Sequence, residues 1–392
     1  MNNFDAFRPL QQEVSGWRQY LHQKPELEFQ VHNTARFVAE KLASFGINHV
    51  DTGIAETGVV ALIQGKGGDG PTIGLRADMD ALPMLEASGK PWSSKVPGKM
   101  HACGHDGHTA MLLGAAKYLA DTRDFRGTVA LIFQPAEENG PGGETGGQRM
   151  VREGVMDRFG ISRVFGIHNM PGIDIGKFAI RSGALMASQD DFDLLVKGRG
   201  GHAAMPHHTV DPVVIAAQIV LGLQALVTRS TDARQPFVIS VTRLIAGEAY
   251  NVIPEQVSMA GTVRTLAPEL RDFAEKQIPA VARAIAVGFG ADIEFSYSRS
   301  VPVTVNWPEE TALALGAARR LVGNENVDHN TPALMIGEDF AYLSEARAGA
   351  LILIGNGPTA ALHNPSYDFC DDALPYGIGY WVNLVEATLA AS

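Results

Sequence analysis

Short apolar runs and helically spaced apolar positions alternate along the first 170 residues of the chain. The runs predict buried strands, and the i, i+3, i+4 spacing predicts helices between them. In one predicted helix, Ala35, Val38 and Leu42 share a face, and Gly46 ends the helix. The predicted strands cover residues 59–64, 72–75, 129–133 and 163–167, and the predicted helices cover 10–21, 34–45 and 109–120. This alternation predicts an α/β domain with a mixed, largely parallel sheet flanked by helices.

A different alternation runs from about residue 190 to residue 300. Its order is strand, helix, strand, strand, helix, strand, over residues 192–196, 212–227, 237–245, 256–265, 268–287 and 292–298. This is the order of a ferredoxin-like α+β sandwich, which folds as its own unit. A strand predicted over 350–355 then returns to the first pattern. We therefore predict one domain made of residues 1–188 and 302–392, with a second domain, 189–301, inserted into it.

A glycine-rich segment, residues 65–70, separates the first two predicted strands. No Gly-Lys-Ser/Thr follows the segment and no helix begins there, so it does not match a phosphate-binding loop. We predict a hairpin turn that pairs strand 59–64 with strand 72–75.

Composition narrows the class of partner. The chain has 392 residues, of which 45% are hydrophobic and 19% charged, as in an ordinary globular protein with more than one domain. The formal net charge of −11 argues against nucleic acid or an anionic membrane as the main partner. The most apolar helical stretch, 213–227, is interrupted by Gln218 and Gln224, and we predict that it is too short and too polar to span a bilayer.

Residues 101–108, His-Ala-Cys-Gly-His-Asp-Gly-His, concentrate metal-binding side chains in one short segment. Such polar groups cannot be buried without partners. Thiolate and imidazole bind zinc-like ions, and a nearby carboxylate can orient an imidazole. The segment therefore predicts a metal site, without distinguishing a structural from a catalytic one.

The two cysteines, Cys103 and Cys370, give no disulfide framework. A thiolate that binds metal fits a reducing compartment better than an oxidising one. The first ten residues include Asp5 and lack the apolar core of a signal peptide. We therefore expect a cytoplasmic protein.

Further polar residues follow the predicted strands. Asp78 and Asp80 come directly after one strand, and either a functional role or capping of turn amides would account for them. Glu137 and Glu138 follow another, where one carboxylate can bind a metal while its neighbour takes a proton from water. His168 and His363 follow two more strands. Ligands of α/β sheets bind at the carboxyl edge of the strands, so we expect these groups to converge there.

The inserted segment has polar residues of its own. His202 follows its first strand, Asn251 joins its paired strands and Arg264 lies on the second of these. Each alone is typical of a loop or surface. Together they could offer an imidazole, an amide and a guanidinium to an oxyanion and a carboxylate.

The chain resembles the metal-dependent aminoacylase/carboxypeptidase family, in the branch of hippurate hydrolase and the auxin-conjugate (IAA-amino acid) amidohydrolases. The matching stretches span residues 21–365 in the family's order. They are LHQKPELEF, RADMDALP, MHACGHDGH, FQPAEE, GIHNMP, GRGGHAAMPH, NVIPE, GTVR, GEDF and LHNP. HACGHDGH combined with PAEE is highly specific. The wider family has His-x-Asp where this chain has Arg76-Ala77-Asp78, a departure typical of this branch.

The resemblance implies a dinuclear amidohydrolase of N-acyl amino acids. Its two divalent ions would be Zn²⁺ or Mn²⁺, with Co²⁺ or Ni²⁺ as further candidates. Glu137 would be the general base, and Asp78 would orient a ligand or tune Glu137. The ligands would be Cys103, His105, Glu138, His168 and His363.

The resemblance also implies a role for the inserted domain, as a lid and a surface for homo-oligomers. His202 would stabilise the oxyanion from its own or a neighbouring subunit. Asn251 and Arg264 would lie near the carboxylate of a small-molecule substrate.

Two other functions fit the same residues. One is a dipeptidase or carboxypeptidase of the same family, which would prefer a free α-amino group. The other is a non-catalytic metal-binding protein. Glu137 favours an enzyme, because a structural metal site needs no spare carboxylate beside Glu138.

Overall fold

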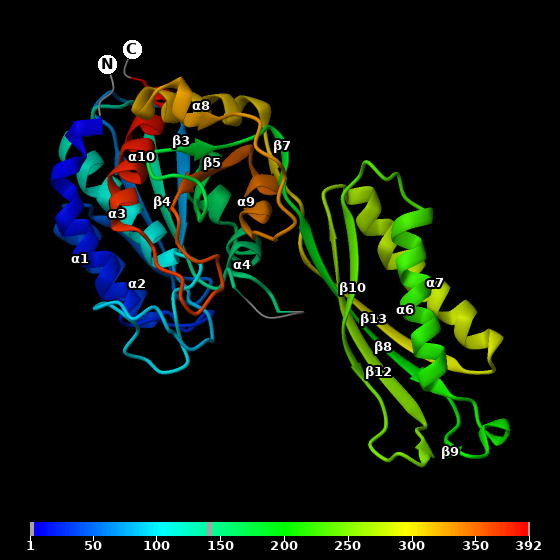
Figure 1. Cartoon of the computed structure of the whole chain (residues 1–392). Coiled ribbons are helices and arrows are strands. Elements are labelled where there is room, and N and C mark those ends of the chain that lie inside the picture. The colour runs from blue at the N-terminus through cyan, green and yellow to red at the C-terminus, as the bar shows by residue number, and fades with distance from the viewer. Residues whose placement is uncertain (1–3, 139–142, 391–392) are drawn as a thin grey trace.

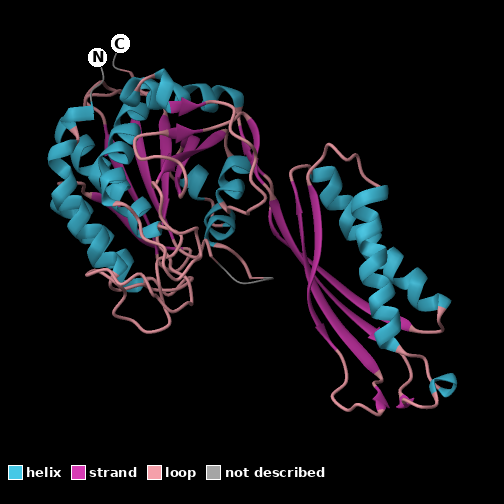
Figure 2. Ribbon diagram, viewed as in Figure 1, coloured by secondary structure: helices cyan, strands magenta, loops and turns pink. Residues whose placement is uncertain are grey.

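The computed structural model describes residues 4–138 and 143–390, which form two lobes joined by extended strands (Figure 1). The large lobe contains both described ends of the chain and surrounds an eight-stranded sheet. The second lobe is a four-stranded sheet with helices on one face (Figure 2). The chain enters the second lobe through β8 and leaves it through β13.

The sheet of the large lobe is mixed. Its order is β1 (His49–Ile54), β2 (Gly58–Gln64), β4 (Thr128–Gln134), β3 (Thr72–Asp78), β5 (Ile161–Met170), β16 (Gly349–Gly355), β6 (Phe178–Ala179) and β15 (Val327–Asp328). The central strands β4, β3, β5 and β16 run parallel, while β1, β2 and β6 add antiparallel pairings. The predicted mixed, largely parallel sheet is thus confirmed.

Helices cover both faces of this sheet, which explains the unbroken apolar strands. In β4, Val129, Leu131 and Phe133 face one core, whereas Ala130 and Ile132 face the other. The first core is closed by α1 (Gln11–His22), α2 (His32–Ser44), α3 (His105–Thr122), α8 (Pro308–Val322) and α10 (Leu374–Thr388). The second is closed by α4 (Gly146–Arg152), α5 (Val155–Arg158) and α9 (Phe340–Ala346). A strand buried on both faces needs apolar residues at every position.

The second lobe has the predicted ferredoxin-like arrangement. Its antiparallel sheet has the order β10 (Phe237–Ile245), β12 (Gln256–Thr265), β8 (Ser188–Lys197) and β13 (Asp292–Val301). Helices α6 (Pro212–Arg229) and α7 (Pro268–Gly288) pack on one face of it. Short pairings flank the lobe: β9 (Gly201–His202) with β11 (Val252–Ile253), and β7 (Gly183–Met186) with β14 (Thr304–Asn306).

Helix α6 differs from the expectation. With 18 residues and a mean hydropathy of 1.6, it is the one helix in the described ranges that is long and apolar enough to cross a membrane by those two criteria. Ile215, Ile219 and Leu223 are buried against the sheet of the second lobe. Its apolar character is therefore partly accounted for by that core, as in the core helix of a globular domain.

Three local predictions need correction. The segment at 65–70 does not form a hairpin, because β4 lies between β2 and β3 in the sheet. Helix α3 begins at His105, four residues earlier than predicted, so half of the metal-binding motif lies in its first turn. Strand β5 extends to Met170, so His168 lies within the strand and not beyond it.

Candidate metal centre

A left-handed glycine places the histidine motif. Gly104 precedes α3 with φ +90°, and a Cβ added there would lie 2.2 Å from the Asn169 side chain and 2.5 Å from the Tyr367 hydroxyl. Only glycine satisfies both the backbone angle and the space. The turn puts Cys103 and His105 on either side of it, both buried. Their ligand atoms consequently face the same region.

The five predicted metal ligands converge. The ligand atoms of Cys103, His105 and His168 all lie within 4.8 Å of one another, and so do those of Cys103, Glu138 and His363. A third such group combines His105 with Glu137 and Glu138. These side chains come from the start of α3, the end of β4, strand β5 and the loop after β16. The carboxyl edge of the parallel strands therefore assembles thiol, imidazole and carboxylate, a donor set suited to zinc-like ions.

Hydrogen bonds fix the orientation of two imidazoles. His105 Nδ1–H donates to the Asp80 carbonyl at 2.9 Å, and His105 Nε2 is buried with no hydrogen-bond partner in residues 4–138 and 143–390. His168 Nδ1–H donates to the Asn169 carbonyl at 2.6 Å, which directs Nε2 to within 3.4 Å of Cys103 Sγ. Such bonds to the other ring nitrogen set the tautomer of metal-binding histidines. Both rings are therefore turned so that Nε2 faces the centre.

His363 reaches the centre through a strained backbone. Its φ is +59°, which is rare for a non-glycine residue, and its N–H donates to the Ala102 carbonyl at 2.8 Å. Its Nε2 lies 2.9 Å from Glu138 Oε1. Strain of this kind persists where the surroundings over-determine it, often at functional sites. His363 is held against the cysteine loop in this way.

The two adjacent glutamates have different electrostatic surroundings. Burial, together with the charges of Glu338 and Glu138, raises the pKa of Glu137 well above its ordinary value. Burial also opposes ionisation of Glu138, but contacts with His363 and His105 outweigh it and lower the pKa of Glu138. Paired carboxylates whose pKa values are pushed apart divide into an anion and a proton carrier. Glu138, as the anion, is therefore suited to bind a metal ion, and Glu137 is suited to act as a general base.

Asp78 belongs to a buried polar network behind the centre. Its Oδ1 accepts from His108 Nδ1–H at 2.7 Å and its Oδ2 from Arg76 at 2.8 Å, and Oδ2 lies 3.6 Å from His105 Nε2. Each nitrogen of the buried Arg76 guanidinium has a partner, since Gln134 accepts from Nε and the carboxylates of Glu338 and Asp339 lie beside Nη2. Asp78 is therefore held next to the His105 ring, where a residue that orients a metal ligand would lie.

Two histidines of the motif are not among the five predicted ligands, although the ligand atoms of His108 lie within 4.8 Å of those of Asp78 and His105. His108 Nε2 accepts from the Asn169 N–H at 2.9 Å while its Nδ1–H is bound to Asp78, so both nitrogens are occupied. His101 is buried, and neither ring nitrogen has a hydrogen-bond partner among the described residues. The buried histidines of the motif therefore have different surroundings, a difference that the spacing of the motif does not reveal.

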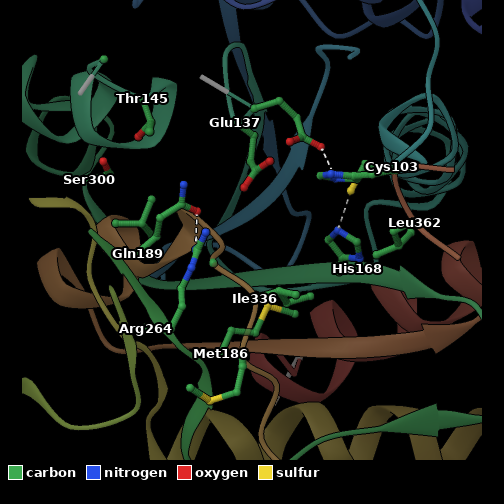
Figure 3. Close-up of a pocket in the computed structure, with 16 residues that line it drawn as sticks. Cys103, Glu137, Thr145, His168, Met186, Gln189, Arg264, Ser300, Ile336 and Leu362 are labelled. Carbon is green, nitrogen blue, oxygen red and sulfur yellow. Dashed lines mark hydrogen bonds and ion pairs between the residues drawn. The ribbon is translucent and has the colours of Figure 1, made fainter. Parts of the chain in front are cut away.

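A cavity of about 490 Å³ adjoins the centre (Figure 3). Cys103, Glu137 and His168 lie on one side of it, and Arg264 and Gln189 lie across from them. Its wall also includes Glu138, Gly143, Thr145, Met186, Ser300, Val301, Met335, Ile336, Gly337, Leu362 and His363. Most of this wall could not be predicted from the sequence, because single residues on separate strands and loops form no pattern that marks a pocket.

Arg264 presents a guanidinium to this cavity. Its side chain donates to the Gln189 amide oxygen at 2.5 Å, and burial lowers the pKa of Arg264. The nearby Asp190 carboxylate is already bound by Arg271 at 2.6 Å. A partly desolvated guanidinium whose hydrogen-bonded partner is neutral favours an anionic group.

His202 and Asn251 are not brought to the centre within one chain. His202 is exposed on β9, at the end of the second lobe remote from the large lobe (Figure 1). Asn251 lies beside it, where its carbonyl accepts the Ala203 N–H at 3.0 Å. The structure therefore separates the three residues of the inserted segment: Arg264 borders the cavity, whereas His202 and Asn251 share the distal end.

The donor atoms fit divalent cations. Burial, reinforced by the Glu138 charge, raises the pKa of the Cys103 thiol well above its ordinary value, so a thiolate there calls for a bound cation. The lowered pKa of Glu138 keeps that carboxylate anionic, and His105 Nε2 is buried without a hydrogen-bond partner among the described residues, so both also suit a bound cation. Cys103, His105, Glu138, His168 and His363 are the residues that would hold such ions.

Several known proteins are similar to this chain in sequence and in fold. The model of peptidase family M20/M25/M40 matches residues 74–387. The chain is 40% identical to an N-acetylcysteine deacetylase of Bacillus subtilis, over 95% of this chain and 96% of the relative. It is 39% identical to the hippurate hydrolase of Campylobacter jejuni, over 98% of each. A crystal structure of a dinuclear metal-binding peptidase from the M20 family of B. subtilis matches with a TM-score of 0.84 and 36% identity, covering 98% of this chain and 100% of that one.

Proposed function

Because the chain belongs to peptidase family M20/M25/M40, we propose that it hydrolyses the amide bond of N-acyl amino acids, releasing a carboxylic acid and an amino acid. The convergence of the five ligands beside Glu137 is the observation that carries the proposal. Two relatives are named for N-acetylcysteine and for hippurate (benzoylglycine), and both compounds are acylated amino acids with a free carboxylate. The cavity between the ligands and Arg264 can accept the acylated amide at one end and a carboxylate at the other.

The chain would bind two divalent ions through Cys103, His105, Glu138, His168 and His363. When bound, such ions supply Lewis acidity toward an amide carbonyl and lower the pKa of water. We propose Zn²⁺ or Mn²⁺, with Co²⁺ and Ni²⁺ as further candidates. The thiolate and imidazoles favour zinc, while the carboxylate suits manganese.

Glu137 is the proposed general base. Its side chain borders the cavity, and its raised pKa suits a group that takes a proton from the attacking water and returns it to the leaving amine. Asp78 is proposed to keep His105 in place, because it lies 3.6 Å from His105 Nε2 while bound to Arg76 and His108.

Arg264 is proposed to bind the substrate carboxylate. It lies opposite the ligand side chains, and its hydrogen bond to Gln189 holds the guanidinium at the cavity wall (Figure 3). An ion pair between Arg264 and the substrate carboxylate in this partly desolvated site would favour N-acyl amino acids over their carboxamide analogues. A carboxamide would leave the Arg264 guanidinium without an anionic partner.

His202 and Asn251 would serve a neighbouring copy of the chain. Both are remote from their own metal centre, so an oxyanion role for His202 needs a second subunit or a large movement of the lobe. We propose a homo-oligomer formed through the second lobe, and a cytoplasmic location consistent with a thiolate ligand. Domain limits at 188/189 and 301/302 are proposed with this division of roles, close to the start of β8 and the end of β13.

A substrate panel tests the proposal. Protein loaded with Zn²⁺ or Mn²⁺ is incubated with benzoyl-, acetyl- and indoleacetyl-amino acids, and free amino acid is measured. We expect metal-dependent hydrolysis of at least one of these compounds, and a strongly reduced kcat/KM for its carboxamide analogue. Faster cleavage of dipeptides with a free α-amino group would instead indicate a dipeptidase. Absence of hydrolysis by fully loaded protein would indicate a metal-binding protein without this activity.

A further inference from the structure

Asp80 contacts the catalytic glutamates through their backbone. Asp80 is fully buried, two residues beyond the end of β3. Its Oδ1 accepts the Glu137 N–H at 3.0 Å and its Oδ2 accepts the Glu138 N–H at 3.0 Å. One carboxylate therefore binds two successive amides, and these amides belong to the proposed base and to a proposed ligand.

The backbone before these glutamates is shaped for this contact. Ala136 has φ +53°, a left-handed conformation that is unusual for alanine. Successive N–H groups next to such a residue point to a common side and form a concave anion-binding nest. Hydrogen bonds to a carboxylate are roughly twice as strong as bonds between neutral groups. Asp80 thus stabilises a strained turn that the chain would not otherwise hold.

The same residue also orients a second ligand. The Asp80 carbonyl accepts His105 Nδ1–H at 2.9 Å, and Asp80 Oδ1 lies 3.4 Å from the same nitrogen. Asp80 therefore binds the backbone amides of Glu137 and Glu138 and also the ring of His105. Its own side chain does not border the cavity, so it does not touch the substrate.

We propose that Asp80 is a positioning residue that fixes the metal ligands and the base relative to one another. The inference rests on the proposed function for the role of Glu137, but not for the roles of Glu138 and His105. Asp78 and Asp80 then have separate tasks. Asp78 holds Arg76 and His108 on one side, and Asp80 holds the turn after β4 on the other.

Asp80→Asn is the test variant. The asparagine side chain has nearly the same shape but can accept only one of the two amides, and its NH₂ group faces the other N–H. Zinc affinity is measured by competition with a chromogenic chelator, kcat and KM are measured at saturating zinc, and the melting temperature is measured with chelator present. We expect zinc affinity and kcat each to fall by roughly 10- to 100-fold, with KM little changed.

Glu26→Gln is a matched control. The Glu26 carboxylate also accepts two successive backbone amides, those of Asn33 at 2.9 Å and Thr34 at 2.9 Å, but at the start of α2. It should lower the melting temperature while leaving zinc affinity and kcat unchanged. If Asp80→Asn behaves like this control, Asp80 is merely structural and the proposal is overturned.

Asp80→Glu covers the case in which the asparagine variant does not fold. It keeps the charge and both acceptor oxygens but displaces them by one methylene, so weaker zinc binding is again expected. Wild-type zinc affinity in either folded variant would overturn the proposal. Because zinc affinity is measured without substrate, this arm decides the role of Asp80 even if no N-acyl amino acid is hydrolysed.

Discussion

Cys103 Sγ lies 3.4 Å from His168 Nε2, although 65 residues separate the two in the sequence. The loop before α3 supplies the thiol and the central strand β5 supplies the imidazole. Both residues are buried, and the hydrogen bond from His168 Nδ1–H to the Asn169 carbonyl directs His168 Nε2 toward the thiol. The sheet edge therefore brings a thiol and an imidazole together, a pair of donors that soft cations favour.

Cys103→Ala is expected to lose metal more than it loses stability. The thiol is one of the proposed ligands, while its deletion removes little apolar volume, so the metal-free variant should melt close to the metal-free wild type. Metal content by elemental analysis, beside a melting curve in chelator, checks this. Cys370→Ala is the control, because Cys370 belongs to none of the ligand groups. Full metal occupancy in Cys103→Ala would refute the assignment.

Glu137→Gln is expected to retain both metals and lose turnover. The amide cannot accept the proton of the attacking water, so kcat should fall by roughly 10²- to 10⁴-fold. Glu138→Gln serves as the contrast, since it removes a proposed ligand and should lower metal content. Glu137 would not be the base if its variant turned over normally, or if the loss of activity only followed loss of metal.

His202→Ala is expected to reduce turnover without changing metal content or melting temperature. The side chain is exposed, so its removal costs little stability, whereas loss of an oxyanion donor typically lowers kcat by roughly 10²- to 10³-fold. His208→Ala, an exposed histidine of the same loop, is the control. Unimpaired turnover in His202→Ala would remove His202 from the site.

The same variant distinguishes the two possible subunits. If His202 acts in a neighbouring copy, mixing His202→Ala with Glu137→Gln chains should restore activity that neither has alone, because some mixed sites are intact. No recovery in verified mixed oligomers would place His202 in its own subunit.

Stability should depend on pH through His22. Burial opposes its protonation, but the Asp106 carboxylate 2.8 Å away outweighs burial and raises the pKa of His22 to about 9. A raised pKa stabilises the fold below the ordinary value of 6.5, and this stabilisation is lost as pH rises through 9. The difference in unfolding free energy between wild type and His22→Gln should thus shrink by on the order of 3 kcal/mol between pH 6 and pH 10. Urea unfolding of both proteins in chelator measures it, and a difference independent of pH would contradict the charged pair.

The convergence of the polar residues at the sheet edge could be predicted from the sequence more fully than the strand pairing or the cavity wall. Glu137, Glu138 and Asp78 follow or end strands, and parallel strands bring their carboxyl ends to one edge, so their convergence could be expected from local pattern. The pairing of strands that are distant in the sequence could not be predicted in this way. The glycines at 65–70 suggested a hairpin, but β4 inserts between the neighbouring strands.

The position of His202 could not be predicted from the sequence for a related reason. Its place depends on how the second lobe is oriented and on which copy it faces, and no periodicity in the chain encodes either. The role of Gln189 could not be predicted either, since a half-buried amide on a strand has no sequence signature and its partner Arg264 is 75 residues away. The sequence marks Asp80 only as one of two alternate aspartates, because backbone amides, its partners, have no signature in a sequence.

Anomalous diffraction from a crystal grown with Zn²⁺ or Mn²⁺ tests the central claim most directly. The account predicts two peaks per chain among Cys103, His105, Glu138, His168 and His363, with zinc–sulfur and zinc–nitrogen distances near ~2.3 Å and ~2.1 Å. A single peak, or peaks remote from these five side chains, would contradict it.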